Sequence, residues 1–126
     1  MHEEEIADYL DLMLESIELI ESRFLKIGLP DEFVQSPNGI TYLDAISMRL
    51  QVVGESVRKI QKVEPSFLKN YPEVEWDKIA RFRDFVSHHY NQVDHEIVFD
   101  ICKVYIPELK AALRKIRSDL PSPDIK

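Results

Sequence analysis

Two long stretches of the chain repeat apolar residues at the spacing of an α-helix, and this pattern restricts the fold more than any other feature. In the stretch over roughly residues 3–27, the spacing from Met13 onward is 4-3-4-3, through Ile17, Ile20, Phe24 and Ile27. In the stretch over about 41–63 the spacing is 3-4-3-4-3, through Leu43, Ile46, Leu50, Val53, Val57 and Ile60. Such spacing places all members of a set on one helix face. We therefore expect two long amphipathic helices that pack as antiparallel neighbours.

Glycine and proline residues predict where these helices end. Gly28 followed by Pro30 should stop the first helix, and a polar loop through Gly39 should follow. Pro65 should end the second helix, and the tyrosine before Pro72 limits residues 66–70 to a short helical piece. A glycine inside the second helix, Gly54, predicts a close approach by another helix.

Two more helices are expected in the second half of the chain. A third helix should begin near 74–76 and run towards His88, with a break around 90–93. Asp94 is a suitable N-cap for the last helix, and Pro107 should kink that helix. The apolar face predicted for the last helix consists of Val98, Ile101, Tyr105, Leu109, Ala112 and Ile116. These four main helices predict an all-α bundle.

Length and composition agree with one helical domain. The chain has 126 residues, of which 44% are hydrophobic and only three are glycine, too few for a small all-β fold rich in tight turns. We expect a single domain over residues 1–120 and a frayed tail over 121–126. No apolar run reaches the ~18 residues of a membrane span, and no signal peptide is visible. The single cysteine, Cys102, should be buried and inert, and it favours a reducing compartment, the cytoplasm.

The net charge is unevenly distributed. It is −7 for the whole chain, but residues 1–21 contain eight acidic residues and no lysine or arginine. The remaining 105 residues therefore sum to +1, so the acidity does not exclude phosphate binding elsewhere. We interpret the acidic stretch as a solvated helix face.

Residues 81–95 contain most of the chemically versatile side chains, including three of the four histidines. Metal-free cleavage of RNA needs a group that takes a proton from a 2′-hydroxyl and returns one to the leaving 5′-oxygen, as His88 can do near neutral pH. It also needs a cation for the phosphorane, and the guanidinium of Arg83 can bind it through two hydrogen bonds. Asp84 lies four residues before His88, on the same helix face, where a carboxylate can fix the tautomer of the ring.

Arg83 and His88 do not share a face of a regular helix. They are five residues apart, or about 140° around the axis. Three solutions stay open: the long arginine side chain swings round, the helix loosens by His88, or two copies of the chain face each other across a two-fold axis, and we favour a combination of a change within one chain with the two-copy cleft.

This segment resembles the signature of HepT-like proteins in the HEPN superfamily. The family motif is an arginine, a polar residue, three further residues, a histidine, any residue and a tyrosine, and Arg83, Asp84, His88 and Tyr90 occupy those positions. The resemblance extends to residues 53–56, 71–76 and 93–99, and so covers most of residues 5–116.

The resemblance implies a HEPN-type up-and-down bundle of four to five helices that forms a homodimer and acts as an RNA-cleaving toxin in the cytoplasm. Arg83 and His88 would be catalytic and Asp84 would support them, with no metal or other cofactor. The partner would be a minimal nucleotidyltransferase antitoxin, which transfers AMP to the motif tyrosine, here Tyr90. Asp84 stands where the family often has asparagine. Its charge would repel substrate unless it pairs with Arg83 or His88.

Other interpretations stay open. Asp84, His88 and His95 offer a carboxylate and two imidazoles to a zinc ion. The chain could instead be a non-catalytic HEPN dimer that only docks a nucleotidyltransferase. Tyr90 could pack into an interface, and Glu55 could support the motif helix or be an exposed charge. We expect His89 to have a surface or dimer-contact role and His95 a structural one.

Overall fold

The computed structural model describes residues 2–88 and 94–120, and for residues 83–88 it describes the backbone alone. Within these residues the chain is helical and contains no strand, which confirms the predicted all-α class. The long elements are α1 (Glu3–Phe24), α2 (Pro37–Val63), α3 (Trp76–His88), α4 (His95–Asp100) and α5 (Ile106–Asp119). Short turns η1 (Pro30–Phe33), η2 (Leu68–Asn70) and η3 (Ile101–Tyr105) lie between them.

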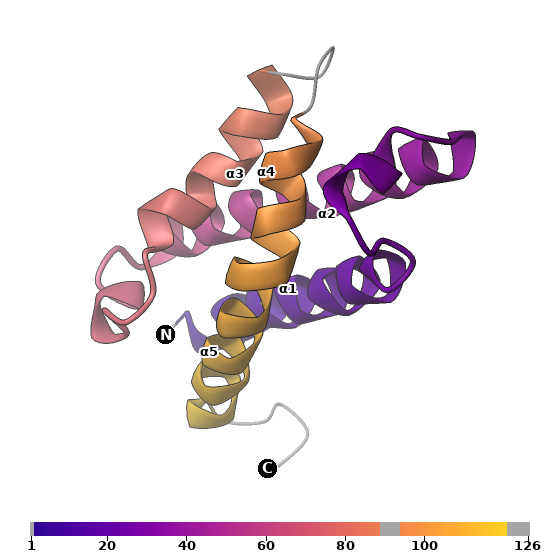
Figure 1. Cartoon of the computed structure of the whole chain (residues 1–126). Helices are drawn as coiled ribbons and strands as arrows, with labels where there is room; N and C mark the ends of the chain where they lie inside the picture. The colour runs from indigo at the N-terminus through magenta and orange to yellow at the C-terminus, as the bar shows by residue number, and fades with distance from the viewer. Residues whose placement is uncertain (1, 89–93, 121–126) are drawn as a thin grey trace.

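The helices form two layers (Figure 1). α1 and α2 pack along their lengths, as their apolar spacing predicts, and α3 packs on α2. The rod made of α4, η3 and α5 crosses in front of α1. The predicted apolar positions of α1 and α2 are buried, except for the half-buried Phe24, and belong to one core.

Two predicted helix ends were wrong. α1 ends at Phe24, four residues before Gly28, and no described residue has the positive φ typical of a glycine C-cap. α2 begins at Pro37 instead of near Thr41, because Ser36 accepts a 3.0 Å hydrogen bond from the backbone N–H of Gly39 and Pro37 occupies the first helical position. The region expected to be a loop also contains the turn η1.

Gly39 lies close to the backbone of Glu32 and Phe33. A Cβ atom there would lie 2.1 Å from the carbonyl oxygen of Glu32 and 2.9 Å from that of Phe33. The absence of a side chain therefore lets the start of α2 pack directly on η1. Gly54 is also buried, on α2.

The last helix contains a π-helical turn, η3, just before Pro107. Pro107 has no backbone N–H and its ring disturbs the carbonyl four residues earlier, which a wider turn relieves. The predicted disturbance at Pro107 thus takes the form of a π turn. Val98, Ile101, Leu109 and Ile116 of the predicted face are buried, whereas Ile106 and Leu113 are buried in place of Tyr105 and Ala112.

The acidic helix α1 pairs with the basic helix α5. Arg117 donates to Asp11 at 2.8 Å, and Lys110 donates to Glu21 at 2.7 Å. The predicted solvated acidic face is therefore only part of the arrangement, because these two carboxylates join α1 to α5. No helix in the described part of the chain is long and apolar enough to cross a membrane.

Candidate functional site

α3 carries three of the four predicted site residues. Arg83, Asp84 and His88 lie in its C-terminal half, and His88 is its last residue. Their side chains, together with Tyr90, His89 and the predicted break at 90–93, lie outside what the structure describes. The predicted contacts among these side chains therefore stay predictions.

The backbone of α3 narrows the geometric question. It is α-helical from Trp76 to His88, so the positions of Arg83 and His88 remain about 140° apart around its axis. The backbone shows no loosening of the helix before His88, which was one of the three ways to bring Arg83 and His88 together. A long reach by the arginine, or a second copy of the chain, remains.

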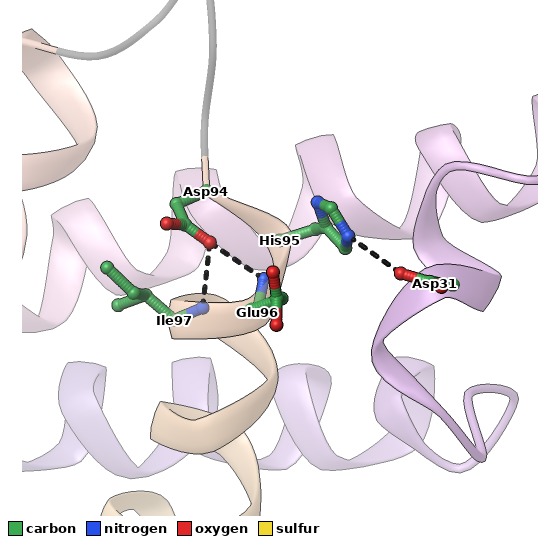
Figure 2. A network of polar contacts seen from close by, with 5 residues as sticks. All are labelled: Asp31, Asp94, His95, Glu96 and Ile97. Carbon is green, nitrogen blue, oxygen red and sulfur yellow. Dashed lines mark hydrogen bonds and ion pairs between the residues drawn. The ribbon is translucent and has the colours of Figure 1, made fainter.

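Polar contacts surround the start of α4, which follows the motif segment in the sequence (Figure 2). Asp94 caps the helix as predicted, since its carboxylate accepts hydrogen bonds from the N–H groups of Glu96 and Ile97 at 3.0 and 3.2 Å. His95 turns towards η1, and its Nε2 lies 3.1 Å from Oδ1 of Asp31. This contact gives His95 the structural role expected of it.

The η1 side of this contact is also held in place. η1 packs on the start of α2 through Gly39, and the carbonyl oxygen of Glu32 contributes to that close approach. Asp31 therefore joins the start of α4 to a segment that is fixed against α2. Asp94 and His95 are the first described residues after residues 89–93.

A metal centre receives no support from the described side chains. Within the described ranges, no three histidine, cysteine or carboxylate side chains gather as a metal site. His95, one of the three zinc ligands considered, contacts Asp31. Asp84 and His88, the other two ligands considered, are among the residues whose side chains the structure does not describe.

A groove of about 790 Å³ runs between the first half of α3 and the η3–α5 segment. Its lining includes the apolar residues Ile79, Phe82, Leu109 and Ala112. At one position Lys78 reaches across from α3 to Tyr105 on η3, and Nζ donates a 2.7 Å hydrogen bond to the phenol oxygen. The same Nζ lies 4.4 Å from the centre of the Tyr105 ring.

The Lys78–Tyr105 pair was missed by reasoning from the sequence. Tyr105 was assigned to the buried face, whereas the π turn leaves it half-buried at the groove. The hydrogen bond from Lys78 to Tyr105 raises the pKa of the lysine. The signal in the sequence is Pro107, because a proline within a helical repeat disturbs the helix in the turn before it.

Glu55 and Cys102 complete the predicted residues. Glu55 lies on α2, 3.9 Å from Lys59, and both are partly exposed. Cys102 is buried, as predicted, and burial raises the pKa of its thiol to about 12.

Comparison with known proteins identifies the family. The model of the family described as "Ribonuclease HepT-like" matches residues 13–116. The chain belongs to the HepT-like family. The matched region of this HepT-like chain begins within α1 and ends within α5, and it contains both the motif and the groove.

Curated relatives agree with this assignment. The chain is 32% identical over 110 residues to "Probable ribonuclease HepT" of Thermococcus cleftensis, which covers 87% of this chain and 94% of that one. It is 32% identical over 120 residues to a "Putative RNase" of Methanocaldococcus jannaschii, over 95% of this chain and 88% of the relative.

A third relative is a longer protein. The chain is 31% identical over 116 residues to a "Gamma-glutamylcyclotransferase and putative RNase" of Methanocaldococcus jannaschii, over 92% of this chain. It spans 49% of the length of that relative. No solved structure matches the HepT-like chain.

Proposed function

We propose that this chain is a metal-independent endoribonuclease, the toxin of a HepT-type toxin–antitoxin pair. The observation that carries the proposal is the family match over residues 13–116, which includes Arg83, Asp84, His88 and Tyr90 at the motif spacing. The names of the relatives add support, because they are given as ribonucleases.

The proposed reaction uses the 2′-hydroxyl of RNA as the nucleophile. His88 takes the proton from this hydroxyl while its oxygen attacks the adjacent phosphorus, and a proton is returned to the 5′-oxygen as the P–O5′ bond breaks. The products are a 2′,3′-cyclic phosphate and a free 5′-hydroxyl. Arg83 stabilises the negative charge of the phosphorane, and Asp84 orients the ring of His88.

A homodimer is part of the proposal. α3 remains α-helical to His88, and the backbone positions of Arg83 and His88 lie about 140° apart. In a two-fold dimer, the arginine of one copy and the histidine of the other can act on the same phosphate. This arrangement keeps α3 regular, as a long reach by the arginine within one chain also would.

The decisive experiment is RNA cleavage in excess EDTA. We expect wild-type protein to cleave, and His88→Ala and Arg83→Ala to lose at least about a hundredfold in rate. His2→Ala and Arg114→Ala are matched controls at exposed positions, and they should retain activity. Equal rates in all five proteins would contradict the catalytic assignment, and loss of wild-type activity in EDTA would favour a metal-dependent reaction.

The same preparations distinguish a toxin from a docking protein. A dimer that binds a nucleotidyltransferase but cleaves no RNA and does not arrest growth on expression would be a binding module. Asp84 is the feature that favours this second function. Its carboxylate is next to Arg83 in the sequence and would repel the phosphate of an RNA substrate.

Neutralisation through Tyr90 is the finer part of the proposal. Transfer of AMP to this tyrosine would place a bulky negative group two residues from His88, where it blocks the substrate by sterics and repulsion. The intact mass after incubation with the partner enzyme and ATP should increase by AMP units in wild type, and Tyr90→Phe should not change. Suppressed toxicity with an unmodified Tyr90 would mean inhibition by binding alone.

A further inference from the structure

The groove between α3 and η3–α5 carries an arrangement that the proposed cleavage does not use. Lys78 and Tyr105 bring their polar ends together at 2.7 Å, from two different elements. When Lys78 donates to the phenol oxygen, the Tyr105 hydroxyl hydrogen and two ammonium hydrogens remain available. Several donors therefore converge at one point of the groove, as the binding of an anionic oxygen requires.

The groove next to these donors is apolar and aromatic. Phe82 is buried beside Tyr105, with the ring centres 6.5 Å apart and the planes at 70°. Ile79 and Leu109 add aliphatic surface to the same lining. An anion-binding point beside aromatic and aliphatic walls matches a nucleotide, whose phosphate and base need these two environments.

The direction of α3 connects this point to the motif. The backbone positions of Lys78, Arg81 and His88 lie within about 80° of one another around the helix axis. Lys78 is ten residues before His88, or about 15 Å along the axis. Arg81 lies between them in the sequence and is exposed. Its positive charge acts to lower the pKa of Lys78. A strand that follows this line would meet two cations before it reaches His88.

From this geometry we propose that Lys78 and Tyr105 form a subsite for a nucleotide of the RNA strand a few positions from the cleaved bond. The phosphate contacts Lys78 and the Tyr105 hydroxyl, and the base lies in the groove beside the half-buried ring of Tyr105, which packs on the buried Phe82. Arg81 contacts the phosphate of a nucleotide nearer to His88. This subsite proposal rests on the proposed nuclease function, because it names the part of the RNA substrate that the groove binds.

Three glutamate and two lysine side chains line the groove beside its apolar residues. Glu75 is 3.9 Å from Lys78 and largely exposed, so this ion pair is screened and weak. Glu75 would nevertheless compete with the phosphate for Lys78. Glu73, Glu108 and Lys115 line the groove as well.

The test measures binding of a 2′-O-methyl RNA strand of about twelve nucleotides, which cannot be cleaved through its 2′-oxygen. Lys78→Gln and Tyr105→Phe should each weaken binding about tenfold, and Lys78→Gln should reduce the salt slope by about 0.7. Glu75→Gln should bind more tightly than wild type. Lys26→Gln, at an exposed position outside the groove lining, is the matched control and should bind as wild type. Thermal unfolding of each variant checks that the fold is intact.

Two further measurements locate the base and separate the ligand sources. A strand with 5-iodouridine should crosslink to Tyr105, as mapped by mass spectrometry. Displacement of the strand by an equal concentration of AMP would overturn the strand assignment in favour of a free nucleotide. Unchanged strand binding by Lys78→Gln with lost association of a protein partner would overturn it in favour of a docking surface.

The outcomes for the subsite and for catalysis are distinguishable. Lys78-dependent strand binding without RNA cleavage by wild type would support the subsite and contradict the proposed nuclease. Cleavage that depends on His88 but has the same KM in Lys78→Gln as in Lys26→Gln would overturn the subsite and leave the nuclease standing. With both correct, Lys78→Gln raises KM about tenfold and leaves kcat unchanged.

Discussion

Cys102 illustrates at the scale of a residue how burial sets the chemistry of a side chain. The thiol lies in the core, and its pKa rises from 9.0 to about 12 because burial disfavours the thiolate. Only the thiolate reacts readily with alkylating reagents. In the unfolded chain this protection is lost.

We predict that iodoacetamide modifies Cys102 about a thousandfold more slowly in the folded protein at pH 8 than in denaturant, the factor that follows from the change in pKa. The intact mass against time measures both rates. Because the folded protein keeps this proton after the unfolded chain has lost it, the free energy of unfolding should also fall as the pH rises from 9 towards 12. Equal alkylation rates in the two states would contradict the burial of the thiol.

Some single residues could be assigned from the sequence and others could not. The cap at Asp94 was predictable because a helix N-cap depends on a few neighbouring residues. The contact of His95 with Asp31 was not, because it joins residues that are 64 positions apart. Lys78 and Tyr105 meet across a groove for the same reason, and no local pattern records such a pairing.

At the scale of the elements, the apolar repeats predicted α1, α2 and α3 with nearly correct centres, since each has a buried face that follows the 3.6-residue period. The ends depend on different physics. The start of α2 is determined by Ser36, Pro37 and the space at Gly39, and this last factor requires knowledge of η1. Around the π turn η3 the regular repeat predicted Leu109 and Ile116 correctly but missed the buried Ile106 and Leu113.

We predict that Gly39→Ala lowers the free energy of unfolding by about 2–4 kcal/mol, because the new Cβ would meet the backbone carbonyls of η1. Gly28→Ala is the matched control. Its Cβ would lie 3.5 Å from the flexible carboxylate of Glu32, and Gly28 has no positive φ, so a change within about 1 kcal/mol is expected. Urea unfolding of the two variants measures both values, and equal losses would contradict the close contact at Gly39.

At the scale of the whole molecule, the charges are arranged so that the acidic and basic ends of the chain stabilise each other. Lys110 and Arg117 on α5 pair with Glu21 and Asp11 on α1, 89 and 106 positions away in the sequence. The total charge could be read from the sequence, but this pairing could not, because it depends on how α5 crosses α1.

We predict a coupling of about 1 kcal/mol between Lys110 and Glu21 in a double-mutant cycle, because the pair is partly buried and the atoms are 2.7 Å apart. The pair Lys59–Glu55 is the control, since it lies within one helix at 3.9 Å with both side chains more exposed. Its coupling should be about 0.3 kcal/mol. Similar values for the two cycles, measured by urea unfolding in low salt, would mean that α1 and α5 are not joined by charge.

The unbroken backbone of α3 has a kinetic consequence. It separates the positions of Arg83 and His88 around the helix, and in the proposed dimer each phosphate meets one group from each of two chains. Turnover would then follow the population of assembled pairs. At dilutions where the pairs dissociate, the velocity would depend on the square of the chain concentration, whereas a site complete within one chain would keep a linear dependence.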